Sequence, residues 1–268
     1  MVSREPFALE FDLTQLNELD KFALLASQSY NLGNNSDWFS CFRGGIFAVH
    51  HRVIGIHNHY QHMHAWIPSG GQFGNVEQHL SDLLFNLDSS MECTIYGLNA
   101  LGYAANPYGF RDVTDRNQLR KVTPANVIGP QPLSGYDAVF PSFKAHWQAN
   151  QDLINTITEQ HDVSKHRRVA FRGGRLRNDP PEGYFDSLGI PDEPAIHAMH
   201  SPMAEIILIP DPKAPPAGRK PTPREEQILL EELVPRFSSF LTESASLANS
   251  DARENIKLAK YELEVGDT

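Results

Sequence analysis

The feature that most constrains the fold is a long series of apolar residues at helical spacing in the first half of the chain. From Phe73 to Leu101 apolar side chains recur in steps of three and four, which is the repeat of one face of an α-helix. The series is Phe73, Val76, Leu80, Leu83, Leu87, Met91, Ile95, Leu98 and Leu101. We therefore expect one long helix that ends between Ala104 and Pro107, because proline cannot continue the hydrogen-bond ladder.

Three further segments carry similar patterns. Residues 13–26 predict a first helix, which should end near residues 31–33. Residues 42–60 also fit helical spacing, but their glycines and β-branched residues leave a strand open as the alternative. The apolar series from Tyr136 to Ser164 predicts a second long helix, in which Pro141 is tolerated near the first turn and Gly173-Gly174 marks the end.

The remainder of the chain is less regular. Residues 178–194 and 211–223 are rich in Pro, Gly and Asp, which favours loops. Residues 204–209 predict an apolar strand, which needs a partner: residues 195–199 or a second copy of the chain. Thr222-Pro223-Arg224-Glu225 has capping-box spacing, so a helix carrying Ile228 should start there, and Pro235 should kink or end it.

Together these patterns predict an all-α fold, a helical bundle of four to five long helices with a small β strand or hairpin after residue 178. We expect residues 1–178 to form the bundle and residues 179–222 to form a Pro/Gly-rich loop with the short β element. Residues 223–268 should form a C-terminal helical arm that packs on the same domain.

Composition excludes several classes of protein. With 268 residues, 40% of them hydrophobic, the chain can bury a full core. Two cysteines, Cys41 and Cys93, are too few for a disulfide framework or a cysteine-based zinc ribbon. The net charge of −10 argues against a protein that coats nucleic acid. Without a signal peptide or a run of about 18 apolar residues, we expect a cytoplasmic protein with no membrane partner.

The segment from Gln160 to Arg168 is the strongest candidate site. Asp162 and His166 are four residues apart, so on a helix the carboxylate can orient the imidazole as a general base. Cations that can hold a phosphate follow at Lys165, Arg167, Arg168 and Arg172. A base beside a fixed positive charge is what metal-independent RNA cleavage requires. The alternative is structural: an exposed ion pair at a cationic helix end, with His161 as a core histidine bonded to a backbone carbonyl.

The layout of the long helices also resembles the HEPN superfamily of helical domains, over roughly residues 10 to 175. The resemblance rests on Ser89-Ser90-Met91-Glu92 and Leu98-Asn99-Ala100-Leu101-Gly102 in one helix, and on His161-Asp162-Val163-Ser164-Lys165-His166 late in the next. Members carry an Arg followed a few residues later by His. Many are metal-independent RNases of toxin–antitoxin and antiviral systems that place this motif at a dimer interface; others are inactive binding partners.

The resemblance implies two readings of this chain. Asp162 and His166 match the motif, but His161 stands where the family has Arg, and a neutral imidazole lacks the fixed guanidinium charge. We therefore expect a non-catalytic or degenerate binding module, a homodimer without a cofactor, whose partner is a protein or RNA. The alternative is an RNase acting through His166, Asp162 and His161. On the same resemblance, Glu92 and Asn99 would project into the bundle as polar supports; the simpler interpretation is that each satisfies a buried neighbour.

Histidines form a second cluster, with six of them between His50 and His64. Imidazole is a common metal ligand, so His57, His59, His62 and His64 are a weaker alternative site for a divalent ion. Carboxylates that usually complete such sites are missing nearby, and no His-Glu-x-x-His motif occurs. Packed or surface histidines without a metal are therefore the favoured interpretation.

Overall fold

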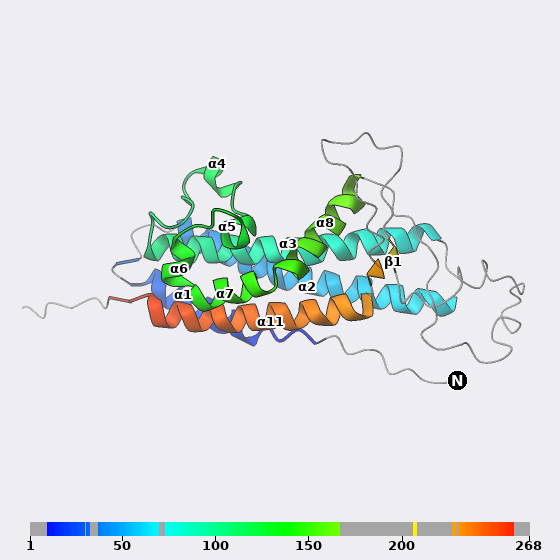
Figure 1. Ribbon diagram of the computed structural model, residues 1–268. Helices are drawn as coiled ribbons and strands as arrows, with labels where there is room; N and C mark the ends of the chain where they lie inside the picture. Colours follow the sequence, from blue (N-terminus) through cyan, green and yellow to red (C-terminus); the bar gives the residue numbers. More distant parts are fainter. Residues whose placement is uncertain are drawn as a thin grey trace, which may run out of the picture. The chain divides into compact units, whose positions relative to one another are not determined.

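A computed structural model describes residues 10–29, 31–32, 37–69, 73–166, 206–207, 227–228 and 230–259. These residues form nine helices and one pair of two-residue strands (Figure 1). The helices are α1 (Thr14–Ser27), α2 (Asp37–Ser69), α3 (Phe73–Ala105), α4 (Arg116–Leu119), α5 (Ala125–Ile128), α6 (Gly135–Val139), α7 (Pro141–Ala149), α8 (Gln151–His166) and α11 (Leu230–Asn255). The expected helical fold is confirmed. No helix in this part of the chain has both the length and the apolar character needed to cross a bilayer.

The helices expected at residues 13–26 and from Phe73 are confirmed as α1 and α3. The open choice for residues 42–60 is resolved in favour of a helix, α2. Its buried side chains follow helical spacing: Phe42, Ile46, Val49, Val53, Ile56 and Tyr60. Burial of this stripe against the rest of the core outweighs the low helix propensity of the glycines and β-branched residues.

The single long helix expected from Tyr136 to Ser164 is wrong, because the segment contains three helices, α6, α7 and α8. Phe140, with φ −129° and ψ 54°, ends the first and precedes Pro141, which occupies the first turn of α7. Asn150, with φ −108° and ψ 21°, separates α7 from α8. Each interruption is a single residue, so apolar side chains continue at nearly helical spacing across both and conceal the breaks.

The second half of the chain also differs from expectation. β1 (Ile206–Ile207) pairs antiparallel with β2 (Gln227–Ile228), so the partner found is one that the sequence patterns did not indicate. Ile228 is thus in a strand, and the described helix α11 starts at Leu230 and continues through Pro235 to Asn255. Residues 173–174, 195–199 and 222–225, to which the other expectations refer, lie outside the described residues.

The chain divides into two compact units. Unit 1 is Met1–Val53, Ser89–Asp152 and Ser238–Thr268, and unit 2 is Ile54–Asp88 and Leu153–Phe237. Four helices, α2, α3, α8 and α11, contribute residues to both units.

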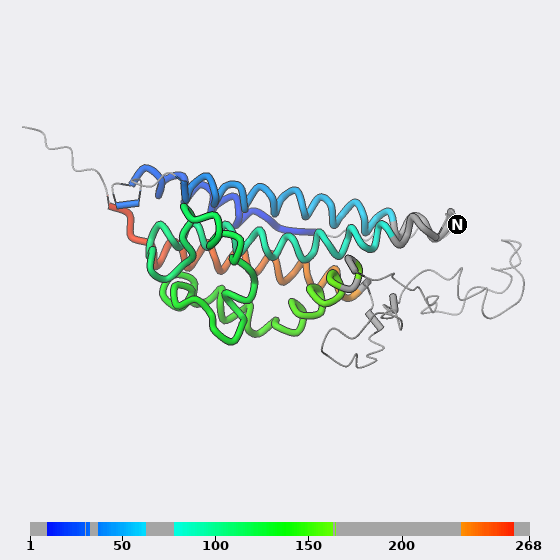
Figure 2. The backbone as a smooth tube through the Cα atoms, turned by 90° about the horizontal axis from the view of Figure 1, so that it is seen from above, coloured from blue at the N-terminus to red at the C-terminus, as the bar shows by residue number. Residues whose placement is uncertain are grey.

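In unit 1, α3 is the innermost helix. Leu98, Asn99, Ala100 and Leu101 are four consecutive residues with 0% exposure, so α3 is covered on all sides there. The first part of α2 covers one side, and Figure 2 shows the segment that contains α4 to α7 on the side opposite α2. The Tyr136 hydroxyl donates to the Ile95 carbonyl of α3, and the amide N–H of Phe143 in α7 donates to buried Asp251 of α11.

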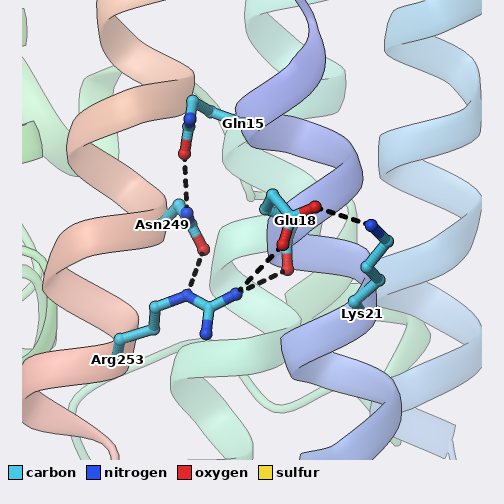
Figure 3. A network of polar contacts seen from close by, with 5 residues as sticks. All are labelled: Gln15, Glu18, Lys21, Asn249 and Arg253. Carbon is cyan, nitrogen blue, oxygen red and sulfur yellow. Dashed lines mark hydrogen bonds and ion pairs between the residues drawn. The ribbon is translucent and has the colours of Figure 1, made fainter.

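A polar network joins α1 to α11 in unit 1 (Figure 3). Asn249 Nδ2 donates to Gln15 Oε1 over 2.8 Å, and Arg253 Nε donates to Asn249 Oδ1 over 3.0 Å. The Arg253 guanidinium also lies 3.6 Å from Glu18 Oε2. Because Arg253 and Glu18 are partly exposed, this ion pair orients the two helices more than it stabilises them.

In unit 1, α2 and α3 approach each other closely at Gly45. A Cβ atom at this position would lie 2.7 Å from the Gly97 amide nitrogen and 2.8 Å from the Cys93 carbonyl oxygen. Those atoms belong to the backbone, so no side-chain rotation can relieve the contact. A side chain at Gly45 would therefore push the two helices apart.

The neighbouring Gly44 gives a matched comparison, because a Cβ there would meet nothing within 4 Å. We expect Gly45→Ala to lower the free energy of unfolding by about 1–3 kcal/mol, the usual cost of overpacking. Gly44→Ala should raise it by up to about 1 kcal/mol, because alanine favours the helix. Urea unfolding of both variants checks this, and equal stabilities would contradict the close helix approach.

Candidate functional site

The polar centre of unit 2 is a buried contact between His161 of α8 and Asp88 of α3. Both residues are 4% exposed. His161 Nδ1 lies 2.6 Å from Asp88 Oδ2, and the Thr158 hydroxyl donates to Asp88 Oδ1 over 2.8 Å. Both carboxylate oxygens thus have a partner, as a buried carboxylate requires.

The sequence of α8 explains how this contact forms. Leu153, Ile154, Ile157 and His161 make one buried stripe at helical spacing, and Thr158 is three residues before His161, so both side chains reach the same carboxylate. The ring of Phe85 meets the His161 ring edge to face at 5.5 Å. His161 is thus a core histidine, but its partner is a carboxylate and not the backbone carbonyl that the sequence suggested.

The pair has a definite chemical character. A carboxylate can only accept a hydrogen bond, so Asp88 fixes the proton of His161 on Nδ1. If the imidazole takes a second proton, its positive charge is balanced by Asp88 at 2.6 Å. Either way the pair supplies no net positive charge. Its low exposure also keeps the ring away from a phosphate in solvent.

Of the other side chains in the predicted catalytic and phosphate-binding set, the structure describes that of Asp162. Asp162 is the next residue on α8 and is exposed, so its side chain and that of His161 have different surroundings. His166 is the last residue of α8. The side chains of Lys165 and His166, and all of Arg167, Arg168 and Arg172, lie outside the described part of the chain. The orienting contact between Asp162 and His166 therefore stays a prediction.

The two expected polar supports differ from each other. Asn99 has no exposed surface in unit 1, where its Nδ2 donates to the Arg111 carbonyl over 3.0 Å and its Oδ1 accepts from the Arg111 amide over 2.9 Å. It thereby anchors the segment that follows α3. Glu92, on the same helix, is exposed.

The histidine cluster has a different composition in the structure from that expected. In unit 2, His59 Nδ1 of α2 lies 3.0 Å from His79 Nδ1 of α3. The His62 ring stacks on the His79 ring, with centroids 5.0 Å apart and planes at 9°. His57 is half-buried, and the side chain of His64 is not among those that the structure describes. Among the described residues, no three His, Cys, Asp or Glu side chains are placed to hold a metal ion.

Burial lowers the pKa of His59. The negative charge of Asp82 raises that pKa, while positive charge on His79 or His62 lowers it further. Burial likewise lowers the pKa of His50, which belongs to unit 1.

Sequence reasoning missed Asp88 and His79. For Asp88 there was a signal, because Leu80, Leu84 and Met91 surround it at helical spacing and imply a buried position. A carboxylate in such a position needs a partner. For His79 there was no such signal, since its role depends on how α2 and α3 are aligned.

Comparison with known proteins does not identify a site: no family model, curated protein or solved structure matches the chain.

The buried pair makes a sharp prediction for neighbouring residues of α8. His161→Ala should lower the free energy of unfolding by about 3–5 kcal/mol, because it leaves the charge of the Asp88 carboxylate buried without its imidazole partner. Asp162→Ala should change it by less than about 1 kcal/mol, because an exposed carboxylate contributes little even where it is paired. Thermal and urea unfolding of the two variants measure the difference. Similar small effects would mean that His161 is not held in the interior.

Proposed function

We propose that this chain is a HEPN-like helical binding module whose motif region is structural and not catalytic. The observation that carries the proposal is the contact of His161 with Asp88 in the interior of unit 2. His161 stands at the motif position where the family has Arg.

Cleavage of RNA without a metal needs positive charge beside the phosphorane as negative charge develops there. An arginine at the motif position supplies that charge permanently. His161 does not, because Asp88 neutralises it and burial separates it from solvent. His166 could still accept a proton as a base, but the stabilising charge would then have to come from cations other than the one at the motif position.

The net charge supports a protein partner over RNA. A chain with a charge of −10 repels nucleic acid at a distance unless a basic surface is strongly focused. We propose that the module works as a homodimer that recognises another protein. The family's inactive members, which act as binding partners, are the precedent that the resemblance supplies.

The test is cleavage of a labelled mixed-sequence RNA by the full chain in EDTA, beside His166→Ala and Asp162→Ala. We expect no cleavage above the buffer control by any of the three, and light scattering of the same samples should give the mass of a dimer. Cleavage by the parent that disappears in His166→Ala would overturn the proposal in favour of a metal-independent RNase. A monomeric mass would remove the dimer from it.

A further inference from the structure

The contact between His59 and His79 points to a function that the motif region does not explain. We propose that His59, His62 and His79 form an acid-sensitive contact between α2 and α3 in unit 2, which holds while one of the paired Nδ1 atoms can accept a hydrogen bond and is released once His59 and His79 are both positively charged. The proposal is independent of the binding role, because none of the three residues belongs to the motif.

The geometry of the two nitrogens requires a shared proton. A separation of 3.0 Å between His59 Nδ1 and His79 Nδ1 is a hydrogen-bond distance. One ring must donate and the other must accept, so the accepting nitrogen carries no proton. Once both rings carry a proton on each of their nitrogens, neither Nδ1 can accept. The hydrogen bond is then replaced by two positive charges at close range.

The third histidine adds to this penalty. His62 is exposed and stacks on the ring of His79, so a proton on His62 places another positive charge beside the pair. Among the described residues, the titratable groups that act on His59 are Asp82 and His79 from α3 and His62 from its own helix. One carboxylate can balance one proton but not two.

The direction of the pH effect follows from the lowered pKa of His59. Above the ordinary histidine pKa of about 6.5, His59 is neutral in both the folded and the unfolded chain, and the contact is intact. Below about 6.5, the unfolded chain binds the proton more readily than the folded one. Stability therefore falls as the pH drops through this value, and it continues to fall until the folded chain also takes the proton.

Acid sensitivity of the whole chain would not by itself identify this contact, because burial also lowers the pKa of His50 in unit 1. The experiment must therefore observe individual rings. His79→Gln is the informative variant, since glutamine can still hydrogen-bond to His59 but does not titrate. His57→Gln is the matched control, two residues before His59 on α2 and half-buried as well.

We would follow the ring C–H resonances of the full chain by NMR in EDTA, from about pH 8 to about pH 5, where histidines titrate. In the parent, His59 should titrate below the ordinary range. In His79→Gln its midpoint should move upward, and in His57→Gln it should stay where it is in the parent. Urea unfolding midpoints over the same range should fall less in His79→Gln than in the parent.

An ordinary midpoint for His59 in the parent would overturn the proposal, as would a midpoint that His79→Gln leaves unchanged. If His79→Gln fails to fold, His62→Gln takes its place and should raise the His59 midpoint by a smaller amount. The proposal would equally be overturned if His62→Gln left the His59 midpoint unchanged and that midpoint were ordinary in the parent.

Discussion

The close approach of the α2 and α3 backbones is the constraint on which the rest of the structure depends. In unit 1 it occurs at Gly45, where a side chain would collide with the backbone of Cys93 and Gly97. In unit 2 a glycine also faces α3, because a Cβ on Gly55 would lie 2.6 Å from Asn86 Oδ1. With its neighbour so near, much of α3 is buried, and the polar side chains on its buried faces must find partners within the protein.

Those partners determine what the candidate site can do. In unit 1, the Thr94 hydroxyl donates to the Ser90 carbonyl over 2.8 Å. The Asn99 side chain hydrogen-bonds to both the carbonyl and the amide N–H of Arg111. In unit 2, the Asp88 carboxylate accepts hydrogen bonds from His161 and Thr158. The motif histidine thus satisfies a buried carboxylate. The same demand for satisfied polar groups that stabilises the interior also keeps the His161 ring away from the surface.

The sequence predicted the parts of the fold that depend on one helix at a time. The apolar series from Phe73 located α3, and the burial of His161 followed from its place at the end of an apolar stripe. The breaks at Phe140 and Asn150 were not predicted, because single-residue interruptions barely disturb apolar spacing. The pairing of Ile206–Ile207 with Gln227–Ile228 was also not predicted, since short strands carry little signal of their partner.

Within the candidate site, the sequence indicated individual residues but not their contacts. Asp88 and His161 are 73 positions apart, and His59 and His79 are 20 positions apart. Such contacts depend on how one helix is aligned against another, which local periodicity does not encode. This is why a histidine cluster on one helix suggested a metal site, while the structure joins two of those rings to His79 of the next helix.

The most direct test of the central claim, that His161 is an internal partner of Asp88, is nitrogen-resolved NMR of the imidazole rings, with and without added RNA. If His161 is paired with Asp88 in the interior, we expect a proton on His161 Nδ1 that exchanges slowly with water. We also expect a ring signal that RNA does not shift. A rapidly exchanging proton, together with a His161 ring that shifts on addition of RNA, would contradict it and return His161 to a site that contacts phosphate.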